Sequence, residues 1–259
     1  MITKDQLNRE IQLPNPPKRI ISLVPSQTEL LYDLGLKDRI VGQTIFCVHP
    51  ESEFKNSIKI GGTKKLNIEK IISLKPDLII ANKEENEKDQ IEEIAKHFPV
   101  WISDVDSFDD ALEMIKSIGE ITETENKATE IFNKITQSRD AFLKQYYPKQ
   151  SVIYLIWNNP FIAVGKDTFI NTMLNEASFE NVITEIRYPE ITLEEIEKIN
   201  PDWVFLSSEP FPFKEEHKIE LDKRLGKTKS VLVDGEIFSW YGSRLVKAWE
   251  YFGGLRMNP

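Results

Sequence analysis

The sequence predicts an α/β protein of two lobes, each with a mainly parallel sheet, joined by a long helix. Three observations predict this class. Apolar strand-like runs alternate with amphipathic helical runs in both halves of the chain, which is typical of parallel sheets covered by helices. One helix-Pro-Asp-strand unit occurs twice, and a helical run of about 23 residues separates the two halves. We therefore expect two related lobes.

The first lobe is expected over residues 1–106. Its strands are apolar runs that end at turn residues, and its helices carry apolar residues at helical spacing. The first helix has the capping-box pattern of Ser26 followed by Glu29, and it stops at Gly35. In chain order the expected elements are a strand at 19–24, a helix at 28–35, a strand at 39–46, a helix at 67–75, a strand at 77–82, a helix at 87–98 and a strand at 100–103.

Residues 107–149 are expected to bridge the lobes with two helices. Ser107 caps the first, and the second runs from Glu125 to Tyr147 with one apolar stripe. At 1.5 Å per residue this second helix is a rod of about 35 Å, long enough to join two lobes rigidly. The second lobe, 150–259, restarts the alternation. Its expected elements are a strand at 151–157, helices at 168–177 and 192–200, strands at 202–207 and 230–234, and a final helix at 243–255.

The repeated unit reads "LNIEKIISLKPDLII" at 66–80 and "ITLEEIEKINPDWVF" at 191–205. Glu69 and Glu194, Pro76 and Pro201, and Asp77 and Asp202 are all 125 positions apart. Asn67 and Thr192 are good N-cap residues, which makes each glutamate the second residue of its helix, facing the solvent. A carboxylate there stabilises a helix by about 0.3–1 kcal/mol, so helix stabilisation is one interpretation. A common partner explains the matched placement more economically.

Composition excludes several classes of function. The net charge of −9 and the pI near 5.1 argue against nucleic-acid binding, which needs clustered Lys and Arg. No apolar run approaches the ~18 residues of a membrane span, so no direct membrane insertion is expected. The amino terminus lacks the apolar segment of about 7–15 residues that marks a secretory signal, which leaves a cytoplasmic location open. The single cysteine, Cys47, cannot form an internal disulfide.

Candidate ligand contacts lie in the loops that follow the strands. In open α/β sheets, ligands bind beyond the carboxyl ends of the strands and against helix N-termini. The loops at 24–29, 44–50, 157–168 and 238–244 carry aromatic rings and two cations, which fit a flat, apolar ligand with polar groups. Packing of the lobe edges is the alternative for each ring. The candidates are Phe46, Trp157, Phe161, Trp240 and Tyr241, with Lys166 and Arg244 as polar groups and the helix starts at Ser26 and Asp167.

Metal and enzyme sites have little support. Cys47 and His49 are secondary metal-ligand candidates, because a lone C-x-H lacks the second pair of a closed zinc site. One such side chain fits better as a ligand to a metal that is already chelated. The chain has no phosphate-binding loop, no G-x-G-x-x-G and no nucleophile elbow, so we expect a protein that is not an enzyme and has no resident cofactor.

The segments "PKRIISLVPSQTELLYDLG", "GGTKKLNIEKIISLKPDLIIA" and "PEITLEEIEKINPDWVF", with the long helix between them, resemble the helical-backbone periplasmic binding proteins of ABC importers. The likeness covers nearly the whole chain and is strongest to the cobalamin-binding branch. It implies two Rossmann-like lobes joined by a rigid helix, with a metal chelate in the cleft between them. The implied function is to capture that chelate, with cobalamin or another corrinoid as the leading candidate, and to deliver it to a membrane permease. A ferric siderophore or haem binder, and a cytoplasmic protein that stores or handles a cofactor, are the alternatives.

The resemblance also implies roles for particular residues. It gives Glu69 and Glu194 a docking role, one in each lobe, in which they pair with arginines of the permease. Tyr188 falls where an aromatic that flanks the ligand is expected, whereas the matching loop of the first lobe, 61–64, has none. The family implies the periplasm or cell envelope, and we expect a monomer.

Overall fold

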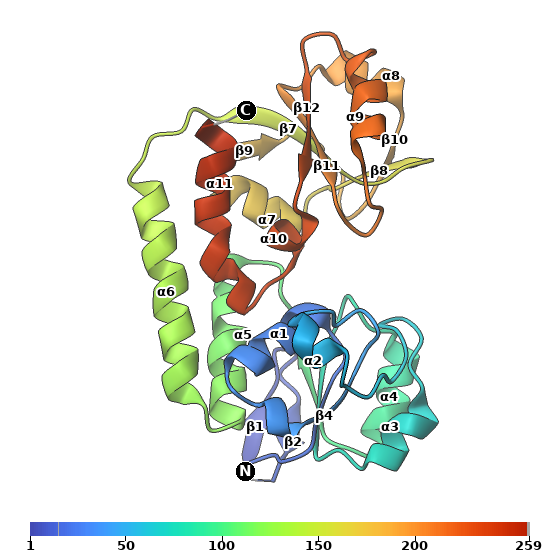
Figure 1. Ribbon diagram of the computed structural model, residues 1–259, viewed down its shortest axis with the longest axis vertical. Coiled ribbons are helices and arrows are strands. Elements are labelled where there is room, and N and C mark those ends of the chain that lie inside the picture. The colour runs from blue at the N-terminus through green and yellow to red at the C-terminus, as the bar shows by residue number, and fades with distance from the viewer. Residues whose placement is uncertain (15, 258–259) are drawn as a thin grey trace. The chain divides into compact units, whose positions relative to one another are not determined.

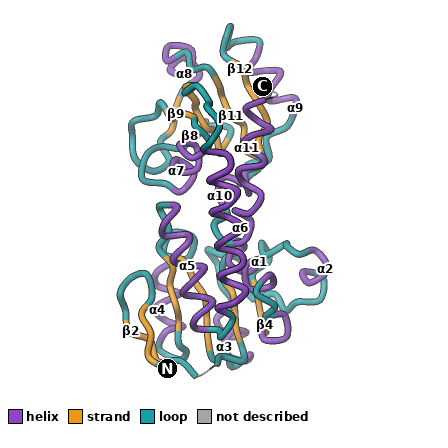
Figure 2. Tube along the Cα trace, turned by 90° about the vertical axis from the view of Figure 1, so that its left-hand side faces the viewer, coloured by secondary structure: helices purple, strands orange, loops and turns teal. Residues whose placement is uncertain are grey.

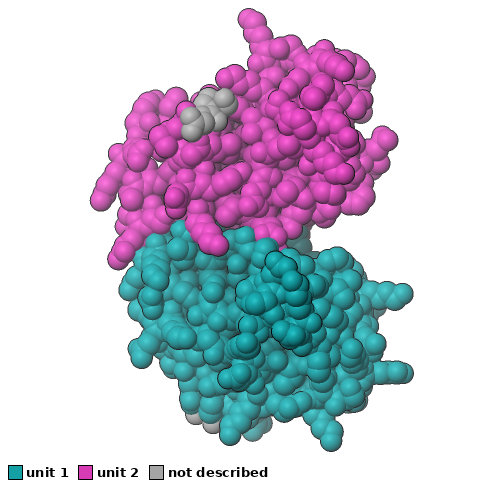
Figure 3. All heavy atoms as spheres, viewed as in Figure 1, with its two compact units in different colours: residues 1–105, 109–136, 241–246 teal, residues 106–108, 137–240, 247–259 magenta. Residues whose placement is uncertain are grey.

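The computed structural model describes residues 1–14 and 16–257 and divides into two compact units. Unit 1 comprises Met1–Val105, Asp109–Thr136 and Tyr241–Val246 (Figures 1 and 3). Unit 2 comprises Asp106–Phe108, Gln137–Trp240 and the segment from Lys247 onward. The bridging helices expected at 107–149 are thus divided between the units, and a short segment near the C-terminus groups with unit 1. The last residues of the expected second lobe, 258–259, lie outside the described part.

The sheet of unit 1 has four parallel strands in the order β4-β3-β5-β6. Every residue of β3, β5 and β6 is buried, as expected for a parallel sheet with both faces covered. Helices α3 and α4 pack against each other and against β4 and β6 (Figure 1). The elements up to β6 are β1 (Ile2–Lys4), β2 (Glu10–Gln12), β3 (Ile20–Ser22), α1 (Pro25–Asp33), η1 (Lys37–Arg39), β4 (Ile40–Gln43), α2 (Glu51–Phe54), α3 (Ile68–Leu74), β5 (Leu78–Asn82), α4 (Lys88–Ala95) and β6 (Val100–Ser103).

The start of α1 differs from the prediction. Its N-cap is Val24, which makes no side-chain cap, and Pro25 is the first helical residue, so the capping box expected from Ser26 and Glu29 is wrong. The carboxylate of Glu29 instead accepts two hydrogen bonds from Arg244, at 2.8 and 2.9 Å. An ion pair with a residue far along the chain therefore replaces the local cap.

Two long helices, α5 (Phe108–Ile121) and α6 (Glu125–Leu143), follow β6 and are drawn in purple in Figure 2. Gly119 lets them approach closely in unit 1, because a Cβ there would collide with the side chain of Ala128. Helix α6 ends one turn before the expected Tyr147, whose ring stacks on Phe142 at 4.7 Å between centroids. Among the described residues, 1–14 and 16–257, no helix has the length and apolar character that a bilayer crossing needs.

The sheet of unit 2 is built around three parallel strands, in the order β7-β11-β12. A parallel strand, β9, joins the start of β7, and two antiparallel strands, β8 and β10, extend the same edge. The mainly parallel sheets that the sequence predicted are therefore confirmed in both units. The strands are β7 (Gln150–Trp157), β8 (Phe161–Ala163), β9 (Phe179–Asn181), β10 (Glu190–Ile191), β11 (Trp203–Ser207) and β12 (Lys229–Val233).

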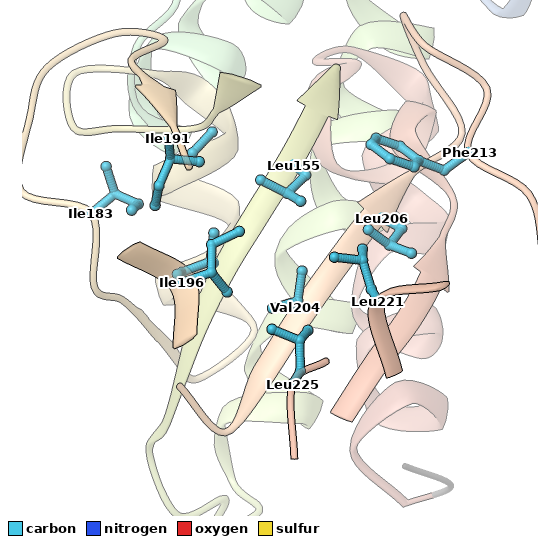
Figure 4. Packing of buried hydrophobic residues seen from close by; sticks show 11 residues of the cluster. Leu155, Ile183, Ile191, Ile196, Val204, Leu206, Phe213, Leu221 and Leu225 are labelled. Atoms are coloured by element: carbon cyan, nitrogen blue, oxygen red, sulfur yellow. The ribbon is translucent and has the colours of Figure 1, made fainter. Parts of the chain in front are cut away.

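The two faces of the unit 2 sheet bury different side chains, because successive strand residues point to opposite faces. On one face Leu155, Val204 and Leu206 pack with Ile196 and Leu221 of α8 and α9 (Figure 4). The opposite face is aromatic, and Tyr154, Phe205 and Phe238 meet edge to face or tilted, 5.3–6.4 Å apart. The helices of unit 2 are α7 (Phe169–Glu176), α8 (Leu193–Ile199), α9 (Glu215–Asp222), α10 (Gly235–Ser239) and α11 (Ala248–Met257), and η2 (Ser243–Lys247) precedes α11.

Candidate functional site

The repeated unit of the sequence starts with the same kind of helix cap in both units. In unit 1 the Asn67 side chain accepts a hydrogen bond from the backbone N–H of Lys70, at 3.0 Å. In unit 2 the Thr192 hydroxyl accepts one from the N–H of Glu195, at 3.2 Å. The predicted N-caps are confirmed, and they make Glu69 and Glu194 the second residues of α3 and α8, both exposed.

The ends of the repeated unit also match. Lys75 and Asn200 terminate their helices in the left-handed conformation, with φ of 47° and 49°. The Asp77 carboxylate then accepts backbone N–H groups of Lys18 and Arg19, at 2.9 and 2.7 Å, just before β3. The Asp202 carboxylate likewise accepts the N–H of Ser151 in β7, at 2.7 Å. Each aspartate thus fastens its own strand to the neighbouring one, and so fixes the helix that carries the glutamate.

The two exposed glutamates have different electrostatic surroundings. Within the part of the chain that the structure describes, Glu69 makes no ion pair. Glu194 lies 3.9 Å from the guanidinium of Arg224, which binds Glu197 more closely, at 3.0 Å. The side chain of Glu194 is still 76% exposed. Both carboxylates are therefore available to a partner, but the one in unit 2 is partly neutralised.

The loop that follows β4 in unit 1 exposes apolar side chains around one buried anchor. Ile45, Phe46 and Val48 are exposed, while Cys47 between them is buried. The Cys47 sulfur lies 3.0 Å from the hydroxyl oxygens of Thr28 and of Thr44. Burial raises the pKa of this thiol, which keeps it neutral. Cys47 thus anchors the loop through its hydrogen bonds to Thr28 and Thr44.

The other predicted contacts in unit 1 are buried, and two of them bind carboxylates. Tyr241 donates its hydroxyl to Glu85 at 3.1 Å, and burial raises the pKa of the phenol well above its usual range. Arg244 binds Glu29, and Ser26 is buried on the first turn of α1. Tyr241 and Arg244 therefore hold the 241–246 segment to unit 1 and are not free on its surface.

In unit 2 Trp157 and Phe161 flank the turn between β7 and β8, and Phe161 packs against the core cluster of Leu155 and Val204. Trp157 is exposed at the end of β7 and contacts Phe211 edge to face, 5.8 Å between centroids. Phe161 is half-buried and begins β8, which pairs with β7 so that Ile162 lies opposite Trp157. Exposed aromatic surface is thus present at the carboxyl end of β7, as the sequence predicted.

Lys166 and Tyr188 lie in a second group, held by a short backbone ladder. The N–H of Arg187 donates to the carbonyl of Lys166 at 2.8 Å, and the Arg187 guanidinium lies 5.7 Å from the Tyr188 ring centre. Lys166 and Tyr188 are exposed. Asp167 does not cap α7, because that role belongs to Thr168, which accepts the N–H of Asn171.

A partly buried carboxyl, Glu209, was not anticipated from the sequence. It follows β11 and accepts hydrogen bonds from the Ser239 hydroxyl, at 2.6 Å, and from the Trp240 indole, at 3.0 Å. Burial raises its pKa. Trp240 is consequently buried at the end of α10 rather than exposed in a loop. No local pattern signals this contact, because Glu209 and Trp240 are 31 positions apart.

The residues described, 1–14 and 16–257, contain no group of three His, Cys, Asp or Glu side chains arranged to hold a metal ion. The secondary candidates Cys47 and His49 therefore find no third ligand among them. Cys47 is also committed to hydrogen bonds with two threonines.

Comparison with known proteins gives a consistent result. The family described as periplasmic binding protein matches residues 20–230. The ABC transporter substrate-binding lipoprotein YvrC of Bacillus subtilis is 34% identical over 213 residues, which are 76% of this chain and 66% of that protein. The vitamin B12-binding protein of Vibrio vulnificus is 28% identical over 199 residues, 74% of this chain and 72% of that protein.

A crystal structure of a possible iron-binding (periplasmic solute-binding) protein from Staphylococcus epidermidis superimposes with a TM-score of 0.76 at 28% identity. The match covers 93% of this chain and 98% of that one. The resemblance and the fold class inferred from the sequence are thereby confirmed. The chain belongs to the periplasmic binding protein family.

Proposed function

We propose that this protein captures a metal chelate, with a corrinoid such as cobalamin as the leading candidate, and delivers it to the permease of an ABC importer. The observation that carries the proposal is the repeated helix-Pro-Asp-strand segment. It places one exposed glutamate in unit 1 and one in unit 2, each as the second residue of a helix with the same kind of N-cap. Charged groups at the rim of an interface mainly steer and align a partner, which suits a transient delivery contact. Relatives named as ABC transporter substrate-binding and vitamin B12-binding proteins support the same function.

The proposed ligand contacts fall into two classes. Phe46 in unit 1 and Trp157, Phe161 and Tyr188 in unit 2 supply apolar surface for a flat ligand, and Lys166 supplies an exposed cation. Four further candidate residues are buried, and we propose that they position the segments to which they belong instead of touching the ligand. These four are Ser26, Trp240, Tyr241 and Arg244.

Ligand capture is tested with a panel of chelates. The protein is titrated with cyanocobalamin, cobinamide, haemin and a ferric hydroxamate siderophore, with free Co²⁺ as the control for bare metal. Absorbance and thermal unfolding are followed. A chelate at about 100 times its dissociation constant is expected to add about 2.7 kcal/mol to the free energy of unfolding. We expect the corrinoids to bind most tightly; if no chelate changes either signal, the proposal is wrong.

Delivery is tested by replacing the two exposed glutamates together. The double variant Glu69→Ala, Glu194→Ala is expected to keep its affinity for the chelate and to lose permease-dependent uptake, because neither side chain belongs to the proposed ligand contacts. The matched control is Glu113→Ala with Glu220→Ala, which removes two exposed carboxylates elsewhere, one from each unit. Equal loss of uptake in both double variants, or loss of chelate binding in the first, contradicts the docking role.

A further inference from the structure

Three loops of unit 2 enter their strands side by side. The Asp202 carboxylate, just before β11, accepts the N–H and the hydroxyl of Ser151 in β7, at 2.7 and 2.8 Å. The N–H of Lys229, at the start of β12, donates to the Asp202 carbonyl at 3.1 Å. The Thr228 hydroxyl donates to the carbonyl of Pro201 at 2.7 Å. The amino ends of β7, β11 and β12 therefore form one continuous edge of the sheet.

This edge is basic in a protein whose net charge is −9. Its three segments, 143–151, 197–202 and 222–229, carry seven cations and three carboxylates, and we call them the basic edge. Glu197 accepts a hydrogen bond from Arg224 at 3.0 Å. Asp222 accepts one from Lys218 at 2.9 Å, so all three carboxylates, with Asp202, are engaged. Six lysines of the edge are exposed and form no ion pair within the described residues, 1–14 and 16–257. They are Lys144, Lys149, Lys198, Lys223, Lys227 and Lys229.

Charges close to the edge decide whether it attracts an anionic surface. The Debye length is about 8 Å at physiological ionic strength, so salt screens the acidic groups on distant parts of the chain. Glu180 on β9, opposite Ser151, is an exposed carboxylate next to the edge and opposes the attraction. The cations of the edge outnumber it, and the local field is positive although the whole protein is acidic.

The first segment of the basic edge also exposes apolar surface. Tyr146 is 89% exposed, and Leu143 is 48% exposed. The Arg256 guanidinium donates to the Gln150 side chain at 2.9 Å and so holds the end of α11 at this segment, where Met257 is 67% exposed. Tyrosine is enriched at membrane–water interfaces, because its ring is apolar and its hydroxyl polar. Lysines beside such side chains are typical of surfaces that bind anionic lipid headgroups.

We propose that the basic edge of unit 2 rests on the anionic headgroups of a membrane, with the lysines among the headgroups and Tyr146 at their boundary with the acyl chains. The contact is adsorption to the surface, without insertion of a helix. It goes beyond the proposed function and does not depend on it. Arg224, which belongs to the edge, lies 3.9 Å from Glu194, so the edge adjoins one of the proposed docking residues. Adsorption would keep the protein near the plane in which a permease lies.

The test is co-sedimentation with phospholipid vesicles, in the absence of chelate and permease. The wild type is expected to bind mixed phosphatidylcholine–phosphatidylglycerol vesicles, to leave pure phosphatidylcholine vesicles unbound, and to be released by added salt. The triple variant Lys149→Gln, Lys223→Gln, Lys227→Gln should bind the mixed vesicles about a hundredfold more weakly, because each lysine near an anionic surface contributes about fivefold. Tyr146→Ser is expected to weaken binding less than the triple variant does, and Glu180→Gln to strengthen it.

The matched control is Lys4→Gln, Lys65→Gln, Lys127→Gln, which removes the same charge from exposed positions of unit 1. It is expected to bind as the wild type does, and thermal unfolding verifies that every variant is folded. Equal losses in the two triple variants, or equal binding to the two kinds of vesicle, overturns the proposal. Binding to a DNA duplex without binding to vesicles also overturns it. These outcomes leave the proposed function untouched, whereas a protein that adsorbs to the vesicles but binds no chelate overturns the proposed function alone.

Discussion

Replacement of Arg244 by methionine is expected to destabilise the protein strongly. The guanidinium reaches both oxygens of Glu29, with Nε at 2.8 Å and Nη2 at 2.9 Å, and the two side chains are only 9% and 13% exposed. Methionine keeps much of the apolar bulk but leaves the carboxylate buried without its cation. Removing one partner of a buried pair costs about 3–5 kcal/mol, because an uncompensated charge remains. At about 2–4 °C per kcal/mol, the melting temperature should fall by about 6–20 °C.

The matched control is Arg224→Met. Arg224 also contacts two carboxylates, but its side chain is 51% exposed, and exposed pairs contribute about 0–1 kcal/mol. The double variant Glu29→Gln, Arg244→Met removes both buried charges and is expected to recover part of the loss. Urea unfolding at a fixed temperature measures all three. Equal losses for Arg244→Met and Arg224→Met would refute the assignment of a buried, strongly coupled pair.

The loss in Arg244→Met should also depend on pH. Burial raises the pKa of Glu29 although Arg244 lowers it, so removal of Arg244 should raise this pKa further. A group whose pKa is higher in the folded state favours folding below its unfolded pKa, and this contribution is lost as the pH rises through the folded pKa. The deficit of Arg244→Met should therefore be largest near pH 8 and shrink towards about pH 5. A deficit that grows on acidification contradicts this reasoning.

Three further variants test contacts that stabilise the fold. Asp77→Ala removes the acceptor of the backbone N–H groups of Lys18 and Arg19 and should cost about 1.5–3 kcal/mol, with faster amide exchange at those two residues; unchanged exchange contradicts the role of the carboxylate. Gly165→Ala should cost about 1–3 kcal/mol in urea unfolding, because its methyl would collide with a neighbouring backbone carbonyl, whereas Gly254→Ala, with open space around it in a helix, should stabilise by about 0.5–1 kcal/mol. Equal changes in the free energy of unfolding at the two glycines would show that the close backbone contact at Gly165 does not cause the loss.

Local signals predicted the fold well where the cause of structure is local. Buried parallel strands are apolar runs, and the helices between them have caps within three residues, as at Asn67 and Thr192. The repeat was readable for the same reason, since its cap, its Pro-Asp turn and its strand are contiguous in the chain.

Contacts between distant residues were not predictable from such signals. Glu29 and Arg244 are 215 positions apart, and Glu85 and Tyr241 are 156 apart. The capping box failed at α1 because the helix already begins at Pro25, which puts Ser26 inside it, and Glu29 binds the distant Arg244. Contacts between distant residues also decide which candidate ligand contacts are exposed. The rings of Phe46, Trp157 and Tyr188 are exposed, as expected. Tyr241 and Arg244 are buried, because they bind carboxylates that no sequence motif identifies.

The two copies of the repeated segment therefore share the contacts that hold their glutamates but differ in the charges around them. Both units hold their glutamate with an N-cap, a left-handed helix end and an aspartate that binds the neighbouring strand. The position one helical turn after Glu69 is Ile72, which is exposed, whereas the corresponding position in unit 2 is Glu197, which binds Arg224. The Arg224 guanidinium lies 3.9 Å from the Glu194 carboxylate, well within the Debye length of about 8 Å at physiological ionic strength. Salt therefore screens their interaction only slightly, and Arg224 offsets part of the negative potential of Glu194. Among the described residues no cation pairs with Glu69, so a basic partner would meet a free carboxylate on unit 1 and would have to compete with the Arg224 guanidinium on unit 2. Two equivalent supports thus present two electrostatically unequal contacts.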